Sequence, residues 1–277
     1  QLPPVGYGLV FHELLKVNQI PQVTLTEVKR QSSISSIPSI SNAIAIGKTP
    51  DFNTEDVKFE KVIGRKNILN SILTEYKKNM EDTQIICATN GLVDEINSRC
   101  SRLNQGKKLL VYNDFFESFE TTGFKLDDKV ICTKNLYSID VMNGSLGKVV
   151  DCYNGKEPRE VVIDAMNQKK AFRLGVIESD NGRQTEISEE LLSNLSLAYA
   201  ITVHKSQGSQ YPKVILPAFQ AANMDRSMLY TAVTRAEQTV VVIGSDKVIN
   251  DSISKVQVEG RRADLFSKII NRLPRAC

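Results

Sequence analysis

Apolar and polar positions follow two different patterns along this chain of 277 residues. Continuous apolar runs, such as QIICATN at 84–90 and TVVVIG at 239–244, alternate with segments of helical apolar period, such as RKNILNSILTEYKKN at 65–79. Continuous apolar runs are typical of parallel strands that are buried on both faces, and amphipathic helices cover such faces. The alternation predicts an α/β fold built on a parallel sheet.

From about residue 108 to residue 195 the chain changes to short strand-like segments separated by turn residues. Asn-Gly pairs occur at 143–144, 154–155 and 181–182, and this dipeptide is typical of tight hairpin turns. We therefore expect a small antiparallel β-barrel at 108–195, inserted into the α/β domain that the segments on both sides form.

Composition narrows the class of protein only slightly. Hydrophobic residues make up 41% and charged residues 24%, and no apolar run approaches the roughly 20 residues that cross a bilayer, so no membrane partner is expected. The net charge of +3 is too small to indicate nucleic acid by itself. The five cysteines are scattered and only two histidines accompany them, so we expect no metal site and reduced thiols in a cytoplasmic protein.

Two short motifs resemble parts of a nucleotide site without completing one. Gly47-Lys48-Thr49 matches the last residues of the phosphate-binding loop motif. The first glycine of that motif would be residue 42, which is Asn. Pro50 also obstructs a helix that would continue from Thr49. The acidic DEIN at 94–97 lies inside a helical pattern rather than at a strand end, which makes it a poor magnesium site. We predict that neither motif binds a nucleotide.

The stretch TVHKSQGSQY at 202–211 is a better candidate. It follows the apolar run LAYAITV, so it reads as the polar turn after a strand, where open α/β sheets place ligand contacts. Thr202, Lys205, Ser206 and the backbone near Gly208 are donors suited to phosphate oxygens. The alternative for this stretch alone is a solvated turn.

Two arginines follow or precede strands in a way that suits an anionic ligand. Arg235 ends the helical segment RSMLYTAVTRA, and Arg30 follows the strand-like VTLTEV. The planar, permanently charged guanidinium suits the γ-phosphate of a nucleotide. For Arg235 the alternative is a surface arginine near a helix C-terminus, where the helix dipole favours a cation. Arg30 has the same ambiguity between a ligand contact and a surface arginine.

Four segments together resemble the later motifs of superfamily-one DNA helicases, in the same order and spacing. They are QLPPVGYGLVF, LTEVKRQ, AYAITVHKSQGSQYPKVILP and MLYTAVTRAEQTVVVIG. The resemblance is to the RecD-like branch, which includes the helicase parts of conjugative relaxases. It implies a RecA-like (P-loop NTPase-type) parallel sheet domain at 23–107 and 196–277, interrupted by the small antiparallel β-barrel insertion at 108–195. Residues 1–22 would be the tail of a first RecA-like domain.

The same resemblance implies the C-terminal motor half of an ATP-dependent 5′ to 3′ DNA helicase. The cofactor would be ATP with Mg²⁺, whose metal ligands are expected in an N-terminal RecA-like domain that acts as a partner of this chain. Because the sequence begins with Gln1 rather than methionine, we expect a piece of a longer protein that is inactive alone. The other partners would be single-stranded DNA and an exonuclease or a relaxase.

The resemblance also assigns roles to individual residues. The residues implied at the γ-phosphate are Gln1, Arg30 and Arg235. Those implied nearer the nucleotide are Gln207, Gly208 and Gln210, and those implied at nucleic acid are Thr202, His204, Lys205, Ser206, Thr89 and Asn90. Two positions depart from the pattern of relatives, because Gln210 replaces an acidic residue that can contact the ribose and Lys29 replaces an aromatic residue.

Other functions stay open at this point. The chain could be a non-catalytic nucleic-acid-binding or interaction module derived from a helicase. It could also be the helicase part of a conjugative relaxase or of an exonuclease V alpha subunit. The sequence upstream would separate these readings, since an active helicase needs a phosphate-binding loop and an acidic pair there.

Overall fold

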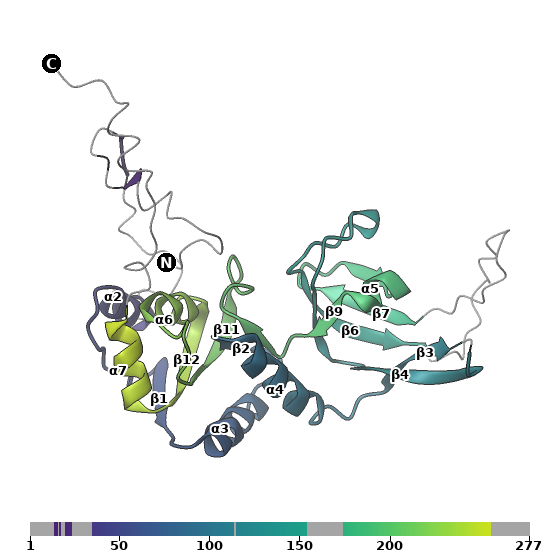
Figure 1. Cartoon of the computed structure of the whole chain (residues 1–277), viewed down its shortest axis with the longest axis horizontal. Coiled ribbons are helices and arrows are strands. Elements are labelled where there is room, and N and C mark those ends of the chain that lie inside the picture. The colour runs from purple at the N-terminus through teal and green to yellow at the C-terminus, as the bar shows by residue number, and fades with distance from the viewer. Residues whose placement is uncertain are drawn as a thin grey trace. The chain divides into compact units, whose positions relative to one another are not determined.

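The computed structural model describes residues 14–15, 17, 20–23, 35–113, 115–153 and 174–255. The chain forms two compact units (Figure 1). The first unit comprises residues 1–89 and 202–277, and the second unit comprises residues 90–201. None of the helices among the described residues is long and apolar enough to cross a membrane.

The first unit holds most of a parallel sheet with the strand order β1-β12-β11-β2-β10, and the division of the chain between the two units falls within β10. The strands are β1 (Val57–Lys61), β2 (Thr83–Cys87), β10 (Ala200–Thr202), β11 (Tyr211–Ala218) and β12 (Ala236–Gly244). β11 pairs in parallel with both β12 and β2, and β1 pairs in parallel with β12. Every residue of β2 is buried, as a continuous apolar run predicts. The α/β fold expected from the sequence is confirmed.

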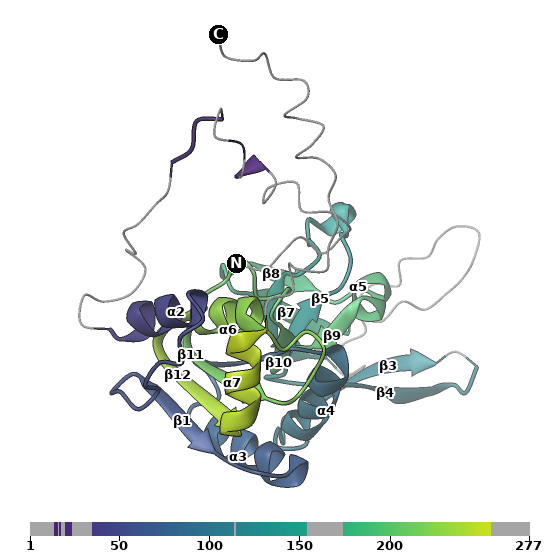
Figure 2. The same ribbon diagram turned by 60° about the vertical axis from the view of Figure 1, so that its left-hand side comes forward.

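Helices cover both faces of this sheet (Figure 2). α3 (Arg65–Lys77) packs against β11 and β12 on one face. On the other face, α6 (Arg226–Val233) packs against α2 (Ile37–Ala45) and α7 (Asp246–Ser254). Alternate strand residues, including Val214 and Leu216, join this helical layer in one hydrophobic core. The alternation follows from the two-residue period of a strand.

The carboxylate of Asp56 caps the start of α2. The Ser36 N–H donates to Asp56 Oδ2 at 2.8 Å, and the Ser35 hydroxyl donates to the same oxygen at 2.6 Å. The Thr54 hydroxyl donates to Asp56 Oδ1 at 3.0 Å. Burial alone would raise the pKa of Asp56, but these hydrogen bonds outweigh burial and lower the pKa from 3.8 to about 2. The charged carboxylate therefore stabilises the fold.

Replacing Asp56 by Asn should lower the free energy of unfolding at pH 7 by about 1 kcal/mol, because the charged acceptor is lost. The folded-state pKa is depressed, so the wild-type contribution is present above the unfolded value of 3.8 and is lost as pH falls toward 2. Urea unfolding at several pH values would measure both effects, and the variant should lose less stability over this acid range. Glu55→Gln, at the exposed neighbour, is the matched control. Equal stability of Asp56→Asn and wild type at pH 7 would contradict this assignment.

The second unit consists mainly of antiparallel strands. β3 (Lys108–Asn113) and β4 (Ser118–Lys125) form a hairpin. A separate sheet has the order β8-β7-β6-β5-β9, with β5 (Lys129–Cys132), β6 (Leu146–Cys152), β7 (Gly175–Ser179), β8 (Gln184–Glu186) and β9 (Leu195–Leu197). The helical elements are α4 (Asn90–Ser101), η1 (Tyr137–Ile139) and α5 (Glu189–Ser193).

The antiparallel strands expected within 108–195 are present in this unit. Two of the predicted Asn-Gly turns have glycines of positive φ, Gly144 at 91° and Gly182 at 78°, and the third, at 154–155, lies outside the described residues. The compact unit is longer than the predicted insertion, because it also holds α4 before the first strand. The boundaries 108–195, and closure into a barrel, stay a prediction.

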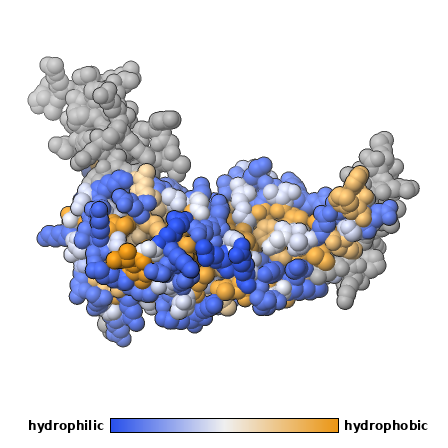
Figure 3. Space-filling model, turned by 60° about the horizontal axis from the view of Figure 1, so that its bottom comes forward, coloured by the Kyte–Doolittle hydropathy of each residue, from blue (hydrophilic) through white to orange (hydrophobic). Residues whose placement is uncertain are grey.

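The tip of the hairpin carries exposed aromatic side chains. Phe115 is 86% exposed and Phe116 is 64% exposed, and their rings contact each other edge to face. Hydrophobic surface is visible at this end of the second unit in Figure 3.

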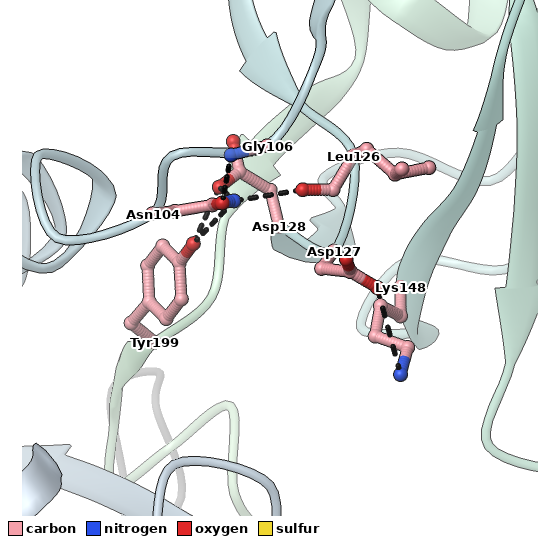
Figure 4. A network of polar contacts seen from close by, with 7 residues as sticks. All are labelled: Asn104, Gly106, Leu126, Asp127, Asp128, Lys148 and Tyr199. Atoms are coloured by element: carbon pink, nitrogen blue, oxygen red, sulfur yellow. Dashed lines mark hydrogen bonds and ion pairs between the residues drawn. The ribbon is translucent and has the colours of Figure 1, made fainter.

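A buried carboxylate fixes the two ends of the antiparallel region to each other (Figure 4). Asp128 is fully buried and accepts hydrogen bonds from the Lys125 N–H at 2.8 Å, from Asn104 Nδ2 at 2.7 Å and from the Tyr199 hydroxyl. Asn104 also accepts from the Gly106 N–H at 2.7 Å. A buried charge is tolerated when donors surround it in this way. The segment before β3 and the segment after β9 thus meet at one side chain.

Asp128→Asn should lower the free energy of unfolding by about 2 kcal/mol, because an amide donor then faces the donors that the carboxylate accepted. Urea unfolding followed by circular dichroism measures the loss. Asp127→Asn is the matched control, since Asp127 is exposed and lies 4.0 Å from Lys148. We expect that control to stay within about 0.5 kcal/mol of wild type. Equal effects of the two substitutions would contradict the role given to Asp128.

Candidate functional site

The predicted loop 202–211 runs from the edge of the sheet where the strands end, its carboxyl edge, to the edge where they begin, its amino edge. At its start the Val203 N–H donates to the carbonyl of Cys87, at the carboxyl end of β2, over 3.0 Å. At its end the Tyr211 N–H donates to the Arg235 carbonyl at 2.9 Å, at the amino ends of β11 and β12. Residues early in the loop therefore lie at the carboxyl edge of the sheet, and residues late in the loop lie at the amino edge.

Successive turns give the loop a defined backbone. The Ser206 N–H donates to the Thr202 carbonyl at 3.1 Å, and the Gln207 N–H donates to the His204 carbonyl at 3.2 Å. The Ser209 N–H then donates to the Ser206 carbonyl at 3.2 Å. Side chains on this loop are consequently held in fixed positions relative to the strand ends.

Two of the four predicted nucleic-acid contacts on the loop are structural side chains in this conformation. Ser206 is fully buried, and its hydroxyl donates to the Val203 carbonyl at 2.8 Å. Thr202 is 9% exposed, and its hydroxyl oxygen accepts from the Lys205 N–H at 3.4 Å. Lys205 is exposed and His204 is partly exposed. The loop thus presents its cationic side chain while its hydroxyls hold the turn.

The three residues predicted nearer the nucleotide are all exposed: Gln207, Gly208 and Gln210. Gly208 has a φ of +90°, and no heavy atom lies within 4 Å of a Cβ built on it. The glycine is therefore required by the left-handed backbone and not by crowding. These residues precede β11, so they belong to the amino-edge part of the loop.

Arg235 contacts the same part of the loop. It lies between α6 and β12, and its Nη1 donates to the Ser209 carbonyl at 3.2 Å. Its Nε donates to the Thr231 carbonyl at 3.3 Å, on the last turns of α6. The structure therefore brings Arg235 and the late loop residues together, although the chain separates them by β11 and α6.

The remaining predicted site residues lie at other places in the chain. Thr89 is partly exposed, two residues after β2 in the first unit, whereas Asn90 is exposed and begins α4 in the second unit. Gln1 and Arg30 lie outside the described residues. Their assignments stay predictions.

The Gly-Lys-Thr motif at 47–49 is the end of a helix. The Gly47 N–H donates to the Ile44 carbonyl at 2.9 Å and the Lys48 N–H donates to the Ala43 carbonyl at 2.9 Å. A phosphate-binding loop precedes its helix and directs such N–H groups at the ligand, whereas this segment follows α2. A Cβ on Gly47, whose φ is +79°, would lie 2.6 Å from Arg226 Nη2. The prediction that this motif is no phosphate-binding loop is confirmed.

The acidic DEIN segment lies within α4, as predicted, and Glu95 pairs with Arg99 at 3.1 Å. Within the described ranges, no group of three or more His, Cys, Asp or Glu side chains could hold a metal ion. Sequence reasoning did not single out Phe219 or Asn223, which follow β11 at the carboxyl edge of the sheet. Their only sequence signal is their position after a buried strand.

Comparisons with known proteins show which helicases this chain is similar to. Residues 197–243, from β9 through most of β12, match the family described as UvrD-like helicase C-terminal domain. The chain is 25% identical over 279 residues to the ATP-dependent RecD2 DNA helicase of Deinococcus radiodurans, covering 97% of this chain and 34% of that protein. It is 32% identical over 142 residues to the RecBCD enzyme subunit RecD of Mycobacterium tuberculosis, covering 50% and 22%.

A solved structure shows the same fold. The Pif1 helicase from Candida albicans aligns with a TM-score of 0.55 at 18% identity, covering 85% of this chain and 58% of that one. These matches support a likeness of this chain to the RecD-like branch of the superfamily-one helicases. The chain spans about a third of the length of the Deinococcus relative and less of the mycobacterial one.

Proposed function

We propose that this chain is the C-terminal motor half of an ATP-dependent DNA helicase that moves 5′ to 3′ on single-stranded DNA. The observation that carries the proposal is the contact of Arg235 with the loop 202–211, which joins a candidate phosphate contact to a candidate DNA contact. The Deinococcus relative, named an ATP-dependent RecD2 DNA helicase, supports the activity. The direction of movement rests on the resemblance of the motifs alone.

The amino-edge residues suit a nucleotide. Arg235 is partly exposed and keeps its charge at any physiological pH, so it can offset negative charge on a transferring phosphoryl group. Gln207, Gly208 and Gln210 are exposed and lie within two residues of Ser209, whose carbonyl accepts from Arg235, so they can supply amide and backbone donors. Gln1 and Arg30 would add further contacts to the nucleotide. An N-terminal RecA-like domain would complete the site with the acidic ligands of Mg²⁺ and the phosphate-binding loop.

Nucleotide and DNA contacts are coupled in this proposal through the Ser209 carbonyl. A phosphate oxygen at Arg235 competes with that carbonyl for the guanidinium donors. The backbone of Ser209 is hydrogen-bonded to that of Ser206, and the backbone of Ser206 to that of Thr202. A movement of Ser209 caused by Arg235 is therefore transmitted along the turns of the loop. Binding and release of the nucleotide would thereby shift Lys205 and His204 relative to the DNA.

The carboxyl-edge residues suit a nucleic-acid backbone. Lys205 and His204 can contact phosphates, while Thr202 and Ser206 keep the loop in place, and Thr89 and Asn90 would extend the surface. Binding through phosphates is largely independent of sequence and sensitive to salt. A lysine on this loop should therefore contribute more to the salt dependence of binding than a lysine elsewhere.

Lys205→Ala should weaken binding of the chain to oligothymidylate and lower the slope of log affinity against log salt by roughly 0.7, the value for one phosphate contact on a single strand. Fluorescence anisotropy over a salt series measures the slope. The control is Lys247→Ala, at an exposed position on α7, which should leave affinity and slope unchanged. A slope equal to wild type in Lys205→Ala would exclude Lys205 from the DNA site.

Arg235→Ala, in the full-length protein, should reduce DNA-stimulated ATP turnover by about 10³-fold or more, the range for arginines that contact a transferring phosphoryl group. Single-strand affinity should stay within about twofold, because the arginine faces the nucleotide edge. Arg183→Ala, at an arginine paired with Asp140 in the second unit, is the control and should turn over ATP at the normal rate.

The 277-residue chain alone should hydrolyse no ATP, and DNA-stimulated turnover by it would overturn the two-domain site.

The context of the motor is a second question. The mycobacterial relative is named as a subunit of the RecBCD enzyme, which favours assembly into a multisubunit enzyme as one alternative. A relaxase context is the other. A third alternative is a non-catalytic module, and it predicts a reading frame without an upstream phosphate-binding loop.

A further inference from the structure

The carboxyl ends of β2 and β11 form a topological switch point in the sheet. The two strands are neighbours, and the chain leaves β11 through α6 toward β12. It leaves β2 in the opposite direction, since the next strand of this sheet along the chain, β10, lies on the other side of β2. In open α/β sheets ligands bind outside the carboxyl ends of two such strands.

The residues at this point are fixed to one another. Phe219 directly follows β11, and Asn223 Nδ2 donates to the carbonyl of Ala88, directly after β2. The guanidinium carbon of Arg65 lies over the Phe219 ring, 5.2 Å from its centroid. Arg65 is exposed whereas Phe219 is partly exposed, so the arginine is the outer layer of the stack.

Arg65 occupies a position that its charge disfavours locally. It is the first residue of α3, after Gly64 at a φ of 91°, and Lys66 follows it, while the first turn holds no acidic residue. The positive end of a helix dipole disfavours cations. Two exposed cations at the start of α3 therefore attract an anionic chain, and a guanidinium held over a ring also offers a flat surface.

We propose that Arg65 and Phe219 form a stacking platform for a base of single-stranded DNA. The proposal rests on the proposed function and adds a base contact to its phosphate contacts. Bases stack on aromatic rings and on arginine guanidinium planes, and this stacking tolerates any sequence. The platform lies at the carboxyl edge of the sheet, where Val203 and the start of the loop 202–211 also lie. Lys205 would hold the backbone and the platform would hold a base.

Two oligonucleotides with equal numbers of phosphates separate the two kinds of contact. One is oligothymidylate, and the other has the same length with abasic sites at every internal position. Anisotropy of the 277-residue chain should show tighter binding of oligothymidylate by roughly fivefold or more, the contribution of stacking at least one base. Phe219→Leu and Arg65→Gln should remove most of that preference.

Arg65→Lys is the sharper variant, because it keeps the charge and loses the plane. It should lower affinity for oligothymidylate while affinity for the abasic oligonucleotide stays at the wild-type value. Phe59→Leu, at a partly exposed ring that packs on Phe52 in the same unit, controls for altered packing and should keep the preference. Urea unfolding of each variant confirms that it is folded.

The outcomes distinguish this inference from the proposed function. Equal wild-type affinity for both oligonucleotides, or an unchanged preference in Arg65→Lys and Phe219→Leu, would overturn the platform and leave the phosphate contacts intact. It would make the pair a structural contact between α3 and β11. Binding of neither oligonucleotide would overturn the proposed function and the platform together.

Discussion

The parallel register of β11 between β2 and β12 is the constraint on which the site depends. It places the carboxyl ends of these strands at one edge and their amino ends at the other. The loop 202–211 must then cross from the first edge to the second, because it leaves beside the end of β2 and enters the start of β11. A shift of this register would separate Arg235 from Ser209 and Asn223 from Ala88 at once.

Local patterns in the sequence predict much of the fold. The apolar runs at 84–90 and 239–244 contain β2 and the end of β12, and the helical period at 65–79 contains α3. The Asn-Gly pair at 181–182 lies at the turn between β7 and β8. These succeed because burial on two faces, helical amphipathicity and positive φ each leave a signal within a few residues.

The site was predictable only in part, for a physical reason. The loop and Arg235 carry recognisable residue types, but the burial of Ser206 depends on a turn geometry that many polar stretches could adopt. The contacts of Arg65 with Phe219 and of Asn104 with Tyr199 join residues far apart in the chain, and such pairs leave no local pattern. A Gly-Lys-Thr sequence binds phosphate in this way only where it leads into a helix, and at Gly47 the chain has just left one.

The meeting of Asn104, Asp128 and Tyr199 has a consequence for how this protein can change over evolutionary time. Since these contacts hold the entry and the exit of the antiparallel region together, the segment between them is a closed loop of the chain. The entropy of closing such a loop grows slowly, by about 0.6 kcal/mol for each doubling of its length. The strands between these residues can therefore be lengthened, shortened or exchanged at small entropic cost, while the tie itself keeps the chain direction on either side of it.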